Sequence, residues 1–317
     1  MNYKCNKRNK KDANYKLEKS QLKNLNEEFY KYFNISYYDT KLINIMDILS
    51  NTSEYKNYIE NKEIKYGKSS VNLDKVDEIE LYNFAKTELN TMYFHCAETF
   101  IRLFIAHGKD TNCPWLEMCD LDIKTYRKYL KNISKGNVSC INSRISEEKL
   151  IMNVFFGQEK EIEEIGVGKD DYENLKEWIV WVANELLDSH KYNTYKHGMA
   201  IYPSNNKISI SGGGKQIKAE GDTLRYFKKI EKDDRFVWAK EETYISYDSI
   251  MAIIFTVNEM SKYIFNTRRY MYGIDKEYKK GWLPGKGWDF SFLMKKDIDN
   301  DFPVNISSYS VQLSYYK

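Results

Sequence analysis

The sequence predicts a mainly α protein with a small antiparallel β-sheet inserted near its C-terminal end. Over residues 39–198, and again over residues 247–272, apolar residues recur every three or four positions, the spacing of one helix face. Between these segments, residues 199–246 alternate apolar and polar residues in short runs, which is typical of strands. The chain has 317 residues, of which 42% are hydrophobic and 30% charged. This composition can bury a core and excludes global disorder.

The composition also excludes several classes of protein and site. No apolar stretch follows the charges of residues 1–11, so no secretory leader is predicted. The longest apolar runs, such as residues 250–257, are too short to cross a bilayer, so no membrane partner is expected. The five cysteines are irregularly spaced, which argues against a disulfide framework and favours the cytoplasm. No cofactor is expected.

Residues 1–38 are predicted to form a basic arm and a first helix. The first 23 residues carry eight basic and two acidic side chains, a net charge of +6. This charge is typical either of an arm that seeks phosphate or of a solvated, frayed terminus. A helical pattern runs from about residue 16 to 62, with Asp39 or Thr40 as an N-cap within it. A polar loop is expected over residues 66–75.

A helical bundle is predicted over residues 39–198. Its main helix spans residues 77–107, and Gly108 suits the left-handed residue that ends a helix. Pro114 is expected to open a helix that runs on to residue 130, and residues 146–156 form a short one. The last begins at Asp170 or Asp171 and ends near His197.

The predicted β insertion spans residues 199–246. Residues 199–211 are expected to form two short strands around an Asn205–Asn206 turn, and residues 224–230 and 235–246 two more. Residues 247–317 contain a last helix, over 247–272, and a tail without a clear pattern.

The helix ending near His197 has an inward face that changes from apolar to polar. Its apolar stripe, from Leu175 to Leu186, continues at Asn193 and His197. A buried polar group without a partner costs about 1–3 kcal/mol, so both side chains need partners. They are expected either to form a site, or to be structural, with His197 capping its own helix end.

The helix over residues 77–107 carries a matching polar group. His95, Glu98 and Arg102 lie within about 60° of one another beside its apolar stripe. Alone, this pattern also fits an exposed Glu98–Arg102 ion pair. Three of the four histidines lie on these two helices: His95, His107 and His197. We therefore expect the helices to pack together and to place Glu98, Arg102, Asn193 and His197 around one pocket.

The segment YNTYKHG, residues 192–198, resembles the Arg-Asn-x3-His-Gly ending of HEPN domains, with matches at Asn193, His197 and Gly198. HEPN domains are helical bundles, often dimeric, found in metal-independent ribonucleases of toxin–antitoxin, abortive-infection and CRISPR systems. Residues 94–107, FHCAETFIRLFIAH, are similar to the preceding helix of such bundles. The resemblance implies an endoribonuclease of phage defence or of a toxin system. It also implies RNA as substrate, a homodimer, and a partner protein or antitoxin.

In the predicted site, His197 is the general acid or base, because an imidazole titrates near neutral pH. Arg102 and Lys196 stabilise charge on the phosphate, Asn193 holds the phosphate or orients His197, and Glu98 fixes Arg102. His95, His107 and Tyr192 are secondary candidates, and no metal is expected. Tyr192 occupies the family's arginine position, which leaves an alternative: a non-catalytic module that binds RNA, a nucleotide or a partner protein.

Three other patterns are weaker. Residues 211–216, SGGGKQ, fit a hairpin turn better than a phosphate loop, because the P-loop frame is missing. Cys113 and Cys119, with His107 nearby, lack the spacing of a paired zinc motif. Trp238 and Tyr244 would serve either to stack on bases or to pack a core.

Overall fold

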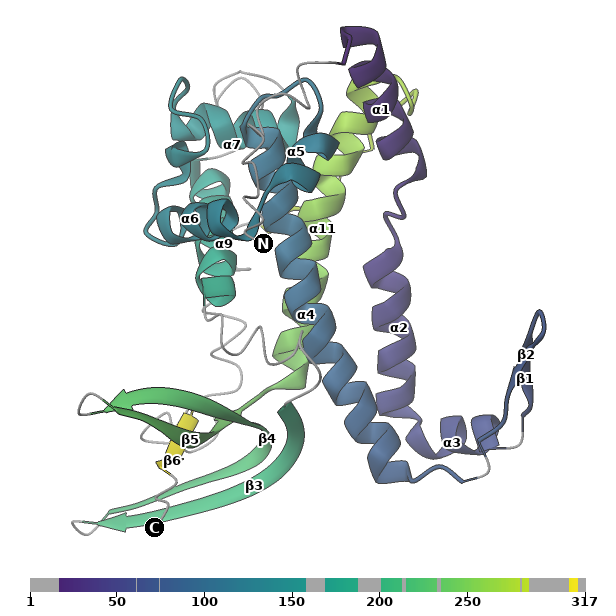
Figure 1. Cartoon of the computed structure of the whole chain (residues 1–317), viewed down its shortest axis with the longest axis vertical. Coiled ribbons are helices and arrows are strands. Elements are labelled where there is room, and N and C mark those ends of the chain that lie inside the picture. The colour runs from purple at the N-terminus through teal and green to yellow at the C-terminus, as the bar shows by residue number, and fades with distance from the viewer. Residues whose placement is uncertain are drawn as a thin grey trace, which may run out of the picture.

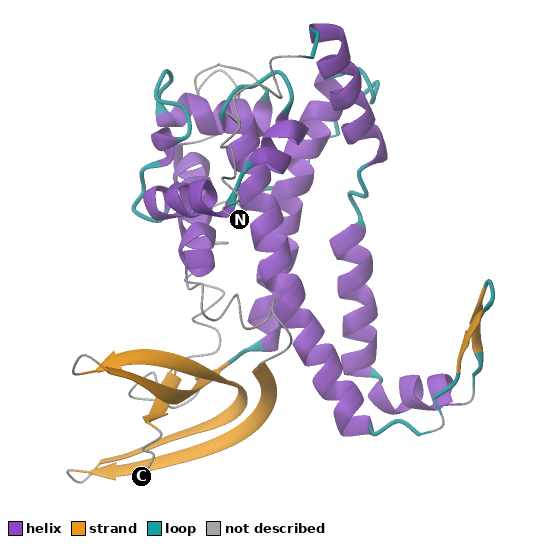
Figure 2. Ribbon diagram, viewed as in Figure 1, coloured by secondary structure: helices purple, strands orange, loops and turns teal. Residues whose placement is uncertain are grey.

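A computed structural model confirms the mainly α fold with a small antiparallel sheet (Figure 2). Two long helices, α4 (Glu78–Gly108) and α11 (Tyr247–Met271), pack side by side at its centre (Figure 1). No described helix is both long and apolar enough to cross a membrane. The structure describes residues 17–60, 62–73, 75–157, 169–187, 201–212, 215–232, 235–279, 281–284 and 308–312.

The N-terminal helical segment, predicted with a new helix starting at Asp39 or Thr40, divides into three helices. They are α1 (Lys19–Tyr32), α2 (Tyr37–Ser50) and α3 (Thr52–Glu60). The predicted caps, Asp39 and Thr40, lie inside α2, which begins at Tyr37. Most of the predicted basic arm, residues 1–16, lies outside the described residues.

The polar loop expected over residues 66–75 is in part a β-hairpin. Strands β1 (Ile64–Tyr66) and β2 (Ser69–Val71) pair antiparallel, and Gly67 supplies the positive φ of +60° in their turn. All six strand residues are exposed. The hairpin projects from the end of the molecule where α4 begins (Figure 1).

Helix α4 is the helix predicted over residues 77–107. Asp77 caps it by accepting hydrogen bonds from the backbone N–H groups of Ile79 and Glu80. Gly108 does not end it in a left-handed conformation; the positive φ, +51°, belongs to Asp110. Gly108 instead allows a close approach, since an added Cβ would lie 3.0 Å from Cγ2 of Ile141. The predicted stripe is buried: Leu81, Ala85, Leu89, Met92, Cys96, Phe100 and Leu103.

The middle of the chain forms a group of shorter helices beside α4. The helix predicted from Pro114 to residue 130 is two helices, α5 (Pro114–Asp120) and α6 (Ile123–Ile133), because Asp122 caps a new one. A short 3-10 turn, η3 (Val138–Cys140), leads to α7 (Glu147–Phe156). Helix α9 (Lys169–Leu187) follows, and its predicted end near His197 lies outside the described residues.

A four-stranded antiparallel sheet follows α9. Its strands β3 (Ile201–Gly212), β4 (Lys215–Lys232), β5 (Arg235–Tyr244) and β6 (Ser308–Gln312) lie in this order. The predicted turn at Asn205–Asn206 is wrong, because both residues lie within β3 and pair with β4. The pairing of β3 with β4 instead ends at Gly212 and Lys215, within SGGGKQ.

The two faces of the sheet differ. One face, here called the bundle face, carries the buried side chains of Ile201, Leu224 and Tyr226, which join the core of the helices. The opposite face, here called the outer face, carries the exposed side chains of Tyr202 and Phe227. Neighbouring residues of a strand point to opposite faces, so each strand contributes to both. The sheet therefore shares one core with the bundle.

Candidate functional site

Glu98 and Arg102 form the i,i+4 ion pair that the sequence predicted. Nε of Arg102 donates to Oε1 of Glu98 at 2.8 Å, and its Nη1 donates to the carbonyl oxygen of Leu121 at 3.0 Å. The guanidinium also lies 4.5 Å from the ring centre of Tyr126. Arg102 thus joins α4 to α5 and α6, which gives it a structural role in addition to any functional one.

His107 lies in the core of the bundle. Its Nδ1 contacts the carbonyl oxygen of Leu103 at 2.7 Å, and its Nε2 contacts the hydroxyl of Tyr30 at 2.5 Å. A carbonyl only accepts, so Nδ1 carries the proton and Tyr30 donates to Nε2. Burial, and then the positive charge of Arg268, lower the pKa of His107 to about 3. The ring is therefore neutral and structural at physiological pH.

The other predicted site residues are divided between α4 and the segment after α9. His95 lies on α4 with an exposed side chain. Tyr192, Asn193, Lys196 and His197 lie outside the described residues. Their approach to Glu98 and Arg102 therefore stays a prediction.

The described part of α9 packs against α4, as that prediction requires. The hydroxyl of Tyr93 donates to Oε2 of Glu185 at 2.8 Å, close to the described end of α9 at Leu187. Arg102 lies nine residues further along α4, which corresponds to about 13 Å of helix. The described end of α9 is therefore nearer to Tyr93 and His95 than to Arg102.

The cysteines do not assemble a metal-binding group with His107. Cys113 is buried, and burial raises the pKa of its thiol, whereas Cys119 is exposed. Both nitrogens of His107 already have partners. Across the described ranges, no three His, Cys, Asp or Glu side chains gather closely enough to hold a metal ion.

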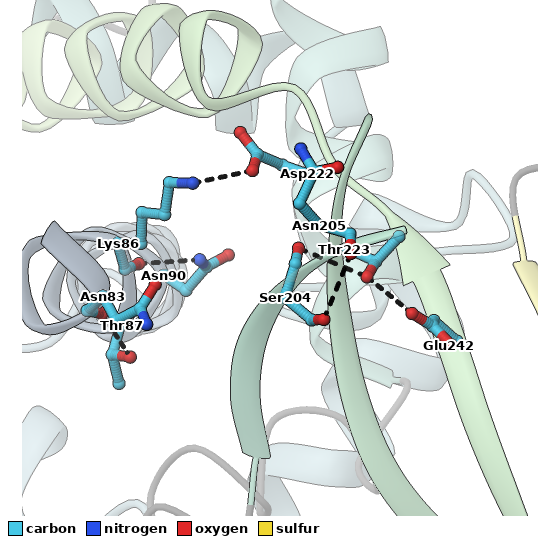
Figure 3. A network of polar contacts seen from close by, with 9 residues as sticks. All are labelled: Asn83, Lys86, Thr87, Asn90, Ser204, Asn205, Asp222, Thr223 and Glu242. Atoms are coloured by element: carbon cyan, nitrogen blue, oxygen red, sulfur yellow. Dashed lines mark hydrogen bonds and ion pairs between the residues drawn. The ribbon is translucent and has the colours of Figure 1, made fainter. Parts of the chain in front are cut away.

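A polar contact that the sequence did not predict joins α4 to the sheet (Figure 3). Nζ of Lys86, whose side chain is 7% exposed, lies 2.6 Å from Oδ1 of Asp222 on β4. The same ammonium lies 4.2 Å and 5.1 Å from the ring centres of Tyr82 and Tyr247. We call this contact the α4–sheet joint. The spacing of Lys86, Asn90 and Tyr93, a second stripe beside the apolar one, is the signal that indicates it.

A second buried charge lies next to this joint. The side chain of Glu242 is 2% exposed and accepts hydrogen bonds from Oγ1 of Thr223 at 2.7 Å and Nε of Arg225 at 2.6 Å. The bond to Glu242 raises the pKa of Arg225. Both buried charges are paired: Lys86 links α4 to the sheet, whereas Glu242 lies on the outer face and links β5 to β4.

No protein-family model, no curated protein and no solved structure matches this chain. The resemblance to HEPN domains rests on the motif at residues 192–198.

Proposed function

We propose that the protein is a metal-independent endoribonuclease of HEPN type that acts as a cytoplasmic homodimer in phage defence or in a toxin–antitoxin system. The observation that carries the proposal is the sequence YNTYKHG at residues 192–198. Two structural features support it. The chain is mainly helical, and the helix that leads to the motif, α9, packs against the helix that carries Glu98 and Arg102.

The proposed reaction is an attack of the ribose 2′-oxygen on the adjacent phosphorus. His197 removes the 2′-hydroxyl proton, a 2′,3′-cyclic phosphate forms, and the 5′-oxygen leaves and takes up a proton. Lys196 stabilises the charge on the phosphate, and Asn193 holds it. Arg102 is the weaker choice for this cation, because Glu98, Leu121 and Tyr126 already hold its guanidinium.

The alternative is a module that binds RNA, a nucleotide or a partner protein such as an antitoxin without cleaving anything. Two observations favour it. Tyr192 stands where the HEPN motif has arginine. Arg102, the only arginine among the proposed site residues, is engaged in structural contacts.

The test compares cleavage of total RNA by the wild type and by His197→Ala, with His190→Ala as a matched control. The control removes a histidine seven residues away, outside the motif. Loss of an acid–base residue is expected to lower the rate by about 10²–10⁴-fold. Products with cyclic-phosphate ends from the wild type and from His190→Ala, but not from His197→Ala, support the ribonuclease. A wild type that binds RNA and leaves it intact supports the binding module.

Cleavage is expected to survive treatment with EDTA, because the proposed groups are an imidazole, an ammonium and an amide. The measurement is the cleavage rate of the EDTA-treated enzyme with and without added Zn²⁺ or Mg²⁺. Loss of cleavage on chelation, with recovery on adding either ion, would contradict the metal-independent mechanism.

A further inference from the structure

Three exposed aromatic side chains lie on the outer face of the sheet, one on each of three neighbouring strands. Tyr202 on β3, Phe227 on β4 and Trp238 on β5 are 51%, 49% and 42% exposed. The pairing of the strands places all three on the same face. Large aromatic side chains are usually more buried, so this surface exposes an unusual amount of aromatic area to a ligand.

Cationic side chains alternate with these rings. Arg225 pairs with Tyr202, Lys240 with Phe227, and Lys229 with Trp238 in the strand register. Nζ of Lys229 lies 5.1 Å from the ring centre of Trp238. Each aromatic side chain therefore has a basic one directly across from it.

The charges of the two faces are arranged differently. On the bundle face, the charged side chains form pairs: Lys207 with Glu220, Lys228 with Glu241, and Asp222 with Lys86. On the outer face, Glu242 is paired with Arg225, but within the described residues no carboxylate pairs with Lys229 or Lys240. The outer face thus has unneutralised positive charge beside its aromatic rings, and it is complementary to an anion that carries flat ring systems.

We propose that the outer face of the sheet binds single-stranded RNA, with bases stacked on Tyr202, Phe227 and Trp238 and phosphates next to Lys229 and Lys240. An unpaired strand exposes the ring faces of its bases, whereas a duplex hides them between neighbouring pairs. The choice of RNA over DNA rests on the proposed function. The binding itself requires neither cleavage nor the motif at residues 192–198.

The test measures binding of a fluorescent 12-residue oligouridylate by anisotropy, with the full chain carrying His197→Ala so that the RNA stays intact. Trp238→Ala and Phe227→Ala are each expected to weaken binding by about 5- to 100-fold, the usual effect of losing one stacked base. Lys229→Ala is expected to weaken it and to reduce the slope of log K against log salt by about 0.7.

Lys228→Ala is the matched control. It removes the same charge from the neighbouring residue of β4, but on the bundle face, where Lys228 pairs with Glu241. This variant is expected to bind the oligouridylate like the parent. Circular dichroism and melting temperature check that every variant is folded.

Several outcomes would contradict the proposal that the outer face binds single-stranded RNA. They are a parent that does not bind the oligouridylate, folded aromatic variants that bind it like the parent, or equal losses for Lys228→Ala and Lys229→Ala. Equal binding of duplex RNA contradicts base stacking, and equal binding of oligothymidylate contradicts the choice of RNA. The ribonuclease proposal is judged separately by cleavage of total RNA. A protein that binds RNA on the outer face and never cleaves it would support the binding proposal and contradict the ribonuclease proposal.

Discussion

His107 shows how the surroundings of a histidine decide its chemistry. The Tyr30 hydroxyl and the Leu103 carbonyl oxygen occupy its two nitrogens, and burial holds its pKa at about 3. His95, on the same helix, has an exposed side chain. The sequence predicted both as secondary site candidates. Helical spacing shows which residues share a helix face, but not which groups from other elements their side chains contact. His107 belongs to the core, and only His95 of the two is accessible to a ligand.

His107 should make the stability of the protein depend on pH. In the unfolded chain it is protonated near pH 6.5, but in the folded protein only near pH 3. Below pH 6.5 the unfolded state therefore binds more protons, so stability falls as the pH drops through this window. The expected loss at pH 5 relative to pH 7.5 is about 2 kcal/mol. Urea denaturation at both pH values measures it.

The wild type is compared with His107→Gln. This variant should be less stable overall, but its stability should lack the pH dependence that His107 causes. Arg269 lowers the pKa of the Asp275 carboxyl, which therefore contributes only at pH values below this window. Identical pH dependence in the wild type and in His107→Gln would contradict the assignment of a buried neutral imidazole.

The α4–sheet joint is a polar contact between a helix and the sheet. Lys86 is 7% exposed and Asp222 is 27% exposed, so the cation has lost more of its hydration than its partner. Removing Lys86 and removing Asp222 should therefore cost different amounts of stability. A buried ammonium left without its carboxylate is costly, whereas a partly exposed carboxylate left without its ammonium regains water.

We expect Asp222→Ala to destabilise the protein by about 2–4 kcal/mol and Lys86→Met by clearly less. The control is Glu220→Ala, two residues away on β4. It breaks the exposed Lys207–Glu220 pair, in which both side chains are at least 60% exposed, and should cost at most about 1 kcal/mol. Urea denaturation of the three variants gives the ranking. A larger loss for Lys86→Met than for Asp222→Ala would show that the carboxylate, not the ammonium, is the group that requires its partner.

The end of α7 meets α11 at Gly157, which has a φ of +70°. A Cβ at this position would overlap Sδ of Met271 and lie 3.0 Å from Cγ2 of Thr267. Gly157→Ala therefore combines backbone strain with a packing clash, and we expect a loss of about 2–4 kcal/mol. Gly136, at φ +81°, has no heavy atom within 4 Å of its would-be Cβ, so Gly136→Ala should cost only the strain, about 1–2 kcal/mol. Thermal melts measure both variants. Equal losses of stability for Gly157→Ala and Gly136→Ala would show that the clash adds no cost.

Over the whole molecule, the sequence predicted best the elements whose signal is local. Helices α4 and α11 follow from long apolar stripes, and their bounds agree with the prediction within about two residues. The turn at Asn205–Asn206 failed because the pairing of β3 with β4 over its full length outweighs a local turn preference. Strand β6 was missed because it exists only by pairing with β5, more than 60 residues earlier in the chain. Of the predicted site, the sequence identified the Glu98–Arg102 pair. It did not identify the contacts of Arg102 with Leu121, at the end of α5, and with Tyr126 in α6.

Amide hydrogen exchange should differ between the buried helices and the exposed hairpin. The C-terminal third of α4, around residues 100–104, is mostly buried and should exchange slowest, because α4 packs against α2, α5, α7, α9, α11 and β3. Residues 64–71 should exchange fastest of the described strands, since every residue of β1 and β2 is exposed. Exchange followed by mass spectrometry gives the order. Strong protection of the hairpin would mean that an assembly covers it in solution.

The length of α4 gives the molecule a mechanical property. At 1.5 Å per residue, its 31 residues form a rod of about 46 Å. Lys86 fastens this rod to the sheet near one end, and His107 anchors it to α1 through Tyr30 near the other. Lys86 and His107 are separated by about 32 Å of helix, so a tilt of α4 by about 5° about Lys86 would displace the end at His107 by about 3 Å. That is more than a hydrogen bond can stretch, so a ligand that rocks the sheet would break the Tyr30–His107 contact without touching it.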